Sequence, residues 1–191
     1  LFHALFMALT ILICYNGVKD GIEKYSNIMM PALLIIVIIL AIRSLMLPGA
    51  AEGIKFYLVP DFSKITAEAA LEALGQVFFS LSLGMGSILT YGSYLGKNEN
   101  IPNVSLIVPL MDTLIAVLAG IIIFPAVFSY GFEPSSGPGL TFVTLPAVFS
   151  EMPMGQLFGG AFFFLLFLAA LTSAISLLEP LIAYMIEEHK W

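Results

Sequence analysis

Hydroxyl and carboxyl side chains occur at four places inside otherwise apolar stretches of this chain. Residues 77–94, "VFFSLSLGMGSILTYGSY", contain four serines, one threonine and three glycines, and a lone Asp112 lies in "VPLMDTLIAVLAGIIIFP". Thr172 and Ser173 are adjacent in "FLAALTSAISLLEP", and Glu179 precedes a proline. Polar groups at membrane depth are costly and usually face the protein interior. Oxygen donors suit small hard cations, so these positions could form cation sites.

The glycine-rich stretch has two interpretations. Gln76 and Ser80 are four residues apart and share a helix face. Gly84 and Gly86 follow closely, and glycine weakens a helix by about 1 kcal/mol relative to alanine. If the helix unwinds there, freed carbonyls and hydroxyls can coordinate a cation. Alternatively, the small residues only allow close helix packing, which spacing alone favours.

The other polar positions also leave alternatives open. Asp112 lies near the start of its apolar run, so it is either interfacial or inside the helix bundle as a cation ligand. Thr172 and Ser173 either bond to carbonyls of the preceding turn, which is commoner, or form an oxygen-rich cation site beside Ala169. Glu179 is protonated, paired or facing a water-filled path.

Composition predicts an all-α integral membrane protein. The 191 residues are 60% hydrophobic and 10% charged, whereas soluble domains have about 25% charged residues. Four of five apolar stretches reach the roughly 20 residues needed to span a membrane. The first is short and has no start Met, n-region or cleavage site, so we expect a helix cut by the chain end in a piece of a larger protein. The predicted spans are approximately 1–15, 28–48, 72–95, 104–130 and 156–186, with loops at 49–71 and 131–155.

Charge and residue types exclude several other functions. The net charge of −6 argues against nucleic acid as a partner. The lone Cys14 cannot form an internal disulfide, and His3 and His189 lie too far apart in sequence to have metal-ligand spacing. No nucleophile–base pair is visible, so we do not expect an enzyme.

The basic residues predict the orientation. With five spans, four lysines share one side, and two lysines with a nearby arginine lie on the other, which makes the first side cytoplasmic and the chain start outside. The two groups are Lys19, Lys24, Lys97 and Lys190, and Lys55, Lys64 and Arg43. Loops 49–71 and 131–155 are then extracellular. In the second loop, "TFVTLPAVFSEMPMG" predicts a helical hairpin over the membrane face, either a lid or an inert surface loop.

Several long motifs resemble one family in the right order. "GQVFFSLSLGMGSILTYGSYL", "TLPAVFSEM" and "FFLLFLAALTSAISLLEPLIAY" resemble the bacterial branch of the neurotransmitter:sodium symporter family. "GVKDGIEKYSNIMMPALLI" resembles the end of that family's fourth helix running into the fifth. The resemblance implies helices four to eight of a transporter with eleven or twelve, built from two inverted five-helix repeats around a midplane site. Helices one and three, which supply much of the family's site, are absent.

The resemblance also implies a substrate site. The region Gly84–Gly86 matches the unwound middle of the sixth helix, and Phe79 matches an aromatic that closes over the substrate. Met85 replaces the family's usual phenylalanine and gives a more adaptable wall. The apolar residues favour a hydrophobic amino acid. The implied substrate-binding residues are Phe79, Ser80, Ser82, Met85, Ser173 and Leu177.

Two sodium sites are implied in the same way. Ser80 and Asp112 match ligands of the first site, where most members have Asn in place of Asp112. The carbonyl of Ala169, with Thr172 and Ser173, matches the second site.

The positions that bind chloride in other members differ here. They correspond to Gln76, Ser80, Asp112 and Ala116, where position 116 is usually Ser. Two unit charges about 4 Å apart interact by roughly 4 kcal/mol at an effective dielectric of 20. The Asp112 carboxylate can therefore stand in for chloride beside sodium, which predicts chloride-independent transport, with Asp112 taking up a proton on the empty return.

The sequence thus predicts sodium-coupled symport of a hydrophobic amino acid by alternating access, in a multi-pass protein of the inner (plasma) membrane. Sodium is the coupling ion, no organic cofactor is expected, and the partners are the amino acid, the lipid bilayer and the remaining helices. A proton-coupled transporter of the same fold is one alternative, but its second cation site would hold Lys or Arg, absent from Ala169–Ser173. Another alternative is a non-transporting scaffold or receptor, which would need no oxygen cluster at two places.

Overall fold

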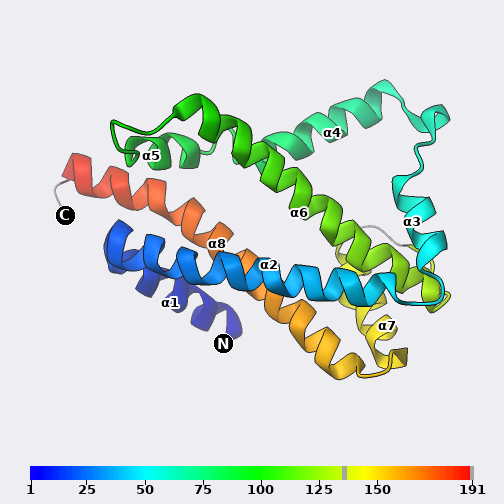
Figure 1. Cartoon of the computed structure of the whole chain (residues 1–191). Helices are drawn as coiled ribbons and strands as arrows, with labels where there is room; N and C mark the ends of the chain where they lie inside the picture. Colours follow the sequence, from blue (N-terminus) through cyan, green and yellow to red (C-terminus); the bar gives the residue numbers. More distant parts are fainter. Residues whose placement is uncertain (135–136, 190–191) are drawn as a thin grey trace. The chain divides into compact units, whose positions relative to one another are not determined.

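The computed structural model describes residues 1–134 and 137–189, and every regular element in those ranges is a helix (Figure 1). The eight α-helices are α1 (Phe2–Tyr15), α2 (Lys24–Leu45), α3 (Ala50–Leu58), α4 (Ala67–Ser80), α5 (Ser87–Ser93), α6 (Ile101–Ser129), α7 (Leu145–Glu151) and α8 (Gly155–His189). Shorter helical segments are the π-helical η1 (Val18–Glu23) and η3 (Leu140–Thr144) and the 3-10 turn η2 (Phe62–Lys64).

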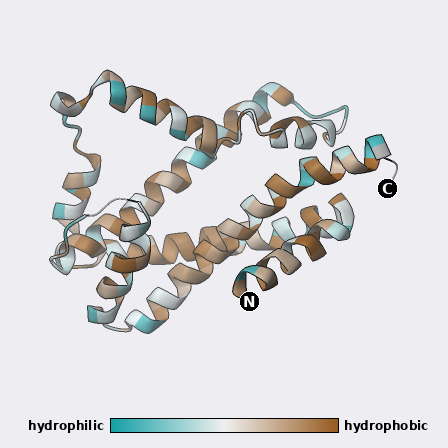
Figure 2. Cartoon of the chain, turned by 180° about the vertical axis from the view of Figure 1, so that it is seen from behind, coloured by the Kyte–Doolittle hydropathy of each residue, from teal (hydrophilic) through white to brown (hydrophobic). Residues whose placement is uncertain are grey.

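Three helices within the described residues are long and apolar enough to cross a membrane. They cover Asp20–Leu45, Ile101–Ser129 and Gly155–Glu188. They overlap the predicted spans 28–48, 104–130 and 156–186; the ends differ by one to three residues, except that the first helix begins eight residues earlier, at Asp20. Figure 2 shows their largely apolar colouring, which is the property that predicted them. The integral membrane class follows from these helices.

The other two predicted spans differ in form. The stretch 1–15 forms the 14-residue α1. The stretch 72–95 is two helices, α4 and α5, because the chain leaves helical geometry between Ser80 and Ser87. Helix α4 also begins earlier than expected, at Ala67, where the Thr66 hydroxyl accepts a hydrogen bond of 3.1 Å from the Ala69 N–H. Such a cap satisfies one of the free amides of the first turn.

The chain divides into two compact units, which we describe separately. The first unit comprises Leu1–Pro31, Ile65–Asp112 and Leu168–Trp191, and the second comprises Ala32–Lys64 and Thr113–Phe167. Three of the four boundaries fall inside α2, α6 and α8, and the fourth lies between η2 and α4. Almost all of the predicted site residues belong to the first unit.

In the second unit, α3 packs closely on α6. The predicted loop 49–71 thus contains a helix that the sequence did not indicate. A Cβ at Gly53 would lie 2.5 Å from the backbone of Pro125, so only glycine allows this approach. The Gly49 N–H donates to the Ser129 hydroxyl at 3.1 Å. These glycines look like helix breakers in the sequence, but they are contact positions in the fold.

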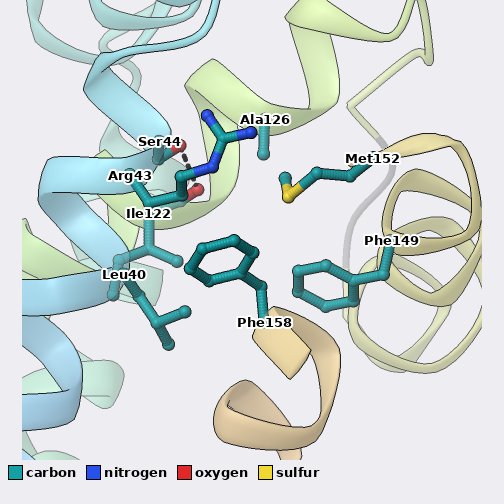
Figure 3. Close-up of a pocket in the computed structure, with 8 residues that line it drawn as sticks. All are labelled: Leu40, Arg43, Ser44, Ile122, Ala126, Phe149, Met152 and Phe158. Atoms are coloured by element: carbon teal, nitrogen blue, oxygen red, sulfur yellow. Dashed lines mark hydrogen bonds between the residues drawn. The ribbon is translucent and has the colours of Figure 1, made fainter. Parts of the chain in front are cut away.

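A buried serine supports the proline turn of α6. Pro125 has no N–H to offer the Ile121 carbonyl four residues earlier, and its ring crowds the preceding turn, which also contains Ile122. The Ser44 hydroxyl, from the end of α2, donates to the Ile122 carbonyl at 2.7 Å, and Ser44 is only 3% exposed. The bond, drawn in Figure 3, satisfies a carbonyl in a region where water is scarce.

The predicted hairpin in loop 131–155 is helical where the structure describes it. η3 and α7 run together from Leu140 to Glu151, and a short turn leads into α8. Helix α7 buries Leu145, Val148 and Phe149, and the Phe149 ring lies 5.6 Å from that of Phe162 on α8. The lid and inert-loop interpretations both remain predictions.

Beside this hairpin, a small apolar cavity carries one cationic group. The Arg43 guanidinium lies 5.3 Å from the centre of the Phe158 ring, a cation–π contact that Figure 3 shows. The lining residues are Leu40, Arg43, Ser44, Ile122, Ala126, Phe149, Met152 and Phe158.

Candidate functional site

The non-helical segment between α4 and α5 begins with a hydrogen-bonded cap. The Leu83 N–H donates to the Phe78 carbonyl at 2.9 Å, and the Ser82 N–H donates to the Phe79 carbonyl at 3.1 Å. This pair of bonds is the Schellman arrangement, in which one residue adopts the left-handed conformation. That residue here is Ser82, with φ of +53°. The left-handed conformation favours glycine, so a residue with a side chain is strained there. Such backbone strain often occurs at functional sites.

Two glycines complete the break. Gly84 and Gly86 have φ values of +80° and +84°, which glycine adopts at little steric cost. Helix α5 restarts directly afterwards, with the Thr90 N–H donating to the Gly86 carbonyl at 3.0 Å. The break lies where the family resemblance places an unwound helix. It places the half-buried Ser82 and backbone outside helical geometry in the middle of an apolar stretch.

Asp112 lies beside the end of α4. The Ser80 hydroxyl donates to Asp112 Oδ2 at 2.7 Å, which joins residues 32 positions apart in the sequence. Asp112 is partly buried on α6. The Asp112 carboxylate thus contacts the end of α4, and its interfacial and cation-ligand interpretations both remain predictions. Its other oxygen lone pairs remain able to coordinate a cation.

The donors on α8 lie within one helical turn. The Thr172 hydroxyl donates to the Ala169 carbonyl at 2.9 Å, the local bond expected of a threonine in a membrane helix. Ser173 is exposed, and the carbonyl accepting from Thr172 is the one predicted as a sodium ligand. The sodium role of these three residues stays a prediction.

The apolar residues predicted to contact substrate are exposed in this structure. Phe79 is 69% exposed, and Met85 and Leu177 are also exposed. Of the four predicted anion-site positions, the structure joins Ser80 and Asp112 directly. Gln76 lies on α4 one turn before Ser80 and is exposed, and Ala116 belongs to the second unit.

A contact between α5 and α8 was not predicted. Ser87, Tyr91 and Tyr94 lie at helical spacing along one side of α5. The Ser87 hydroxyl donates to the Ser176 carbonyl at 2.8 Å, and the hydroxyls of Tyr91 and Ser176 are 3.5 Å apart. Their spacing was the only sequence signal, and it does not identify a partner.

Glu179 is paired in this structure. The Tyr94 hydroxyl donates to Glu179 Oε1 at 2.7 Å, and Glu179 is only 4% exposed. Of the three alternatives left open by the sequence, the structure supports pairing. A buried carboxyl group needs such a donor, because leaving it unsatisfied is costly.

The donor types around the break restrict which ion could bind. Among the described residues, no three His, Cys, Asp or Glu side chains gather as a metal site. The available ligands are hydroxyls, carbonyls and the single Asp112 carboxylate. Such an oxygen set suits a hard cation and does not suit a transition metal.

Comparison with known proteins gives consistent matches. The sequence profile of the sodium:neurotransmitter symporter family matches residues 2–191. An uncharacterized sodium-dependent transporter, YhdH, of Bacillus subtilis is 51% identical over 93% of this chain and 40% of its own length. The human sodium- and chloride-dependent creatine transporter 1 is 32% identical over 91% of this chain and 28% of its own.

A solved structure matches as well. The crystal structure of MhsT in complex with L-phenylalanine has a TM-score of 0.87 and 50% sequence identity, over 98% of this chain and 43% of that protein. The chain therefore spans about 40% of the length of the bacterial relatives that it matches. The relatives are named as transporters, not as enzymes.

We expect Tyr94→Phe to destabilise the protein, because the buried Glu179 loses its hydroxyl donor. An unsatisfied buried acceptor costs about 1–3 kcal/mol, so the apparent Tm in detergent should fall measurably. Tyr25→Phe is the matched control, since Tyr25 is exposed on α2 and should tolerate the change. Equal melting temperatures for the two variants would contradict the role of the pair.

Proposed function

This chain belongs to the sodium:neurotransmitter symporter family, and we propose that it forms helices four to eight of a sodium-coupled symporter for hydrophobic amino acids. The observation that carries the proposal is the break between α4 and α5, with Ser80 bonded to Asp112 at its edge. Discontinuous helices at the membrane midplane are where transporters of this architecture bind solute and ion.

Sodium would take its first site between the end of α4 and α6. Asp112 supplies a negative charge, and Ser80 supplies a hydroxyl oxygen that can turn its lone pairs toward the ion. The 2.7 Å bond between them keeps both oxygens within reach of one cation. The second site would use the Ala169 carbonyl with the hydroxyls of Thr172 and Ser173 on α8. Binding there would compete with the present Thr172 bond, so the hydroxyl must rotate.

The substrate would lie against the break. Phe79, Met85 and Leu177 offer apolar surface, while Ser82 and Ser173 offer hydroxyls. Methionine has three rotatable bonds and adapts to side chains of different shape. Support comes from MhsT, which was crystallised with L-phenylalanine and is 50% identical to this chain over the matched region, 43% of its own length. A large apolar amino acid is therefore the first substrate to test.

Coupling between sodium and substrate follows from their different affinities for the two conformational states of the transporter. A ligand shifts a conformational equilibrium only by the difference in its affinity for the two states. Sodium between Ser80 and Asp112 fixes the edge of the break that carries Phe79 and Ser82, so it favours the state ready for substrate. Substrate then favours closure of the outer side, and release of both on the inside completes the cycle.

Chloride should not be required. Ala116 lacks the hydroxyl that chloride-dependent members have at this position, and Asp112 already carries the negative charge beside the ion. The human creatine transporter is named as sodium- and chloride-dependent, whereas the Bacillus subtilis relative is named only as sodium-dependent. On the empty return, a proton on Asp112 would replace the missing sodium charge.

The proposal is tested by uptake into proteoliposomes holding the full-length transporter. Labelled phenylalanine and leucine are supplied under a sodium gradient, against choline, and again with chloride replaced by gluconate. We expect uptake that needs sodium and persists without chloride. Uptake driven equally by a proton gradient in choline would favour the proton-coupled alternative. Absence of binding and uptake for any amino acid would favour a scaffold or receptor.

Asp112→Asn should make uptake dependent on chloride. With the fixed charge gone, uptake in chloride-free buffer should fall at least tenfold, which corresponds to about 1.4 kcal/mol. Added chloride should restore part of it, because the anion replaces the lost carboxylate. Glu99→Gln is the control, since it removes an exposed charge near the start of α6 without touching Ser80. Unchanged uptake with no chloride response would contradict the role of Asp112.

A further inference from the structure

Pro180 leaves one carbonyl of α8 without its helical donor. The residue lies inside the continuous helix Gly155–His189. Proline has no N–H, so the carbonyl four residues earlier, that of Ser176, lacks its usual partner. In the hydrocarbon region such a group must be satisfied by another part of the protein.

Ser87 supplies that partner from the other side of the break. Its hydroxyl donates to the Ser176 carbonyl at 2.8 Å, and its side chain is only 3% exposed. A Cβ on the preceding Gly86 would lie 3.7 Å from Pro180 Cβ, which is ordinary contact. The junction between the break and α5 therefore rests directly on the proline turn of α8.

The bond also lies between the two regions of the proposed binding site. Ser87 is the first residue of α5, immediately after the left-handed Gly86. Ser176 is adjacent to Leu177 and three residues after Ser173 on α8. One hydrogen bond thus connects the segment that carries Ser82 with the helix that carries the predicted second sodium site.

The other contacts between α5 and α8 lie further from the break than the Ser87–Ser176 bond. Tyr94 bonds to Glu179 two turns away from the break, and the Tyr91 hydroxyl is 3.5 Å from that of Ser176. These contacts keep the body of α5 on α8. Ser87 makes the bond at the end of α5 that adjoins the break.

We propose that Ser87 is a positioning residue that couples the substrate-binding break to the α8 sodium site through the carbonyl freed by Pro180. The role rests on the proposed function, since it needs both sites. Loss of the hydroxyl should let the end of α5 move relative to α8. Substrate and sodium would then bind more weakly, although neither touches Ser87.

The test measures the half-saturating concentrations of sodium and phenylalanine for uptake by the full-length transporter, together with the apparent Tm. Ser87→Ala should raise both half-saturating concentrations three- to tenfold. Ser93→Ala is the matched control, because its hydroxyl donates to the Thr90 carbonyl within α5 and not to α8. That variant should match the wild type within twofold.

A double variant separates positioning from simple stability. In Ser87→Ala/Pro180→Ala, the new backbone N–H at position 180 can satisfy the Ser176 carbonyl within α8. We expect the double variant to recover thermal stability while its half-saturating concentrations stay raised, because the link between the helices is still missing. If Ser87→Ala alone does not fold, the double variant carries the test.

Two results would overturn this role while leaving the proposed function intact. One is sodium-dependent uptake in which Ser87→Ala has wild-type half-saturating concentrations. The other is a double variant that recovers stability and half-saturation together, which would mean that Ser87 only satisfies a carbonyl. A wild-type protein with no sodium-dependent uptake would instead overturn the proposed function, and this role with it.

Discussion

The requirement that backbone polar groups be satisfied away from water governs this chain. Long helices meet it internally, but each break or proline leaves groups that need another partner. Here one such partner is a serine from another helix: Ser87 donates to the Ser176 carbonyl freed by Pro180. Ser44 likewise donates to the Ile122 carbonyl, in the turn that precedes Pro125. Irregular backbone therefore occurs where another helix can support it, and the proposed site occupies such a place.

In the break between α4 and α5, conformational costs are opposed by hydrogen bonds that stabilise the irregular backbone. Glycine inside a helix costs about 1 kcal/mol, and a left-handed non-glycine residue costs about 1–3 kcal/mol. The cap bonds from Ser82 and Leu83 and the anchor at Ser87 oppose these costs. The break begins directly after Ser80, whose hydroxyl donates to Asp112. Backbone carbonyls in an unbroken helix are bonded to the following turn, so the proposed ion and substrate sites depend on the break.

The sequence predicted those helices whose apolar character is visible within a single continuous segment. Helices α2, α6 and α8 are long apolar runs, and the position of the break followed from family resemblance around Gly84. Contacts between distant segments were not predictable. Helix α3 lies in a region predicted as a loop, and its Gly53 is needed for close packing on α6. The pairing of Glu179 with Tyr94 and of Ser87 with Ser176 depends on how α5 lies on α8, which no local pattern encodes.

The central claim is that sodium and substrate share one binding unit around the break. Purified full-length protein in detergent allows a direct test by equilibrium binding of labelled phenylalanine over a range of sodium concentrations, and of sodium with and without phenylalanine. Linkage requires each ligand to tighten the other by the same factor, and the account predicts a factor of at least ten in both directions. Phenylalanine binding that is equally tight in sodium and in choline would contradict it.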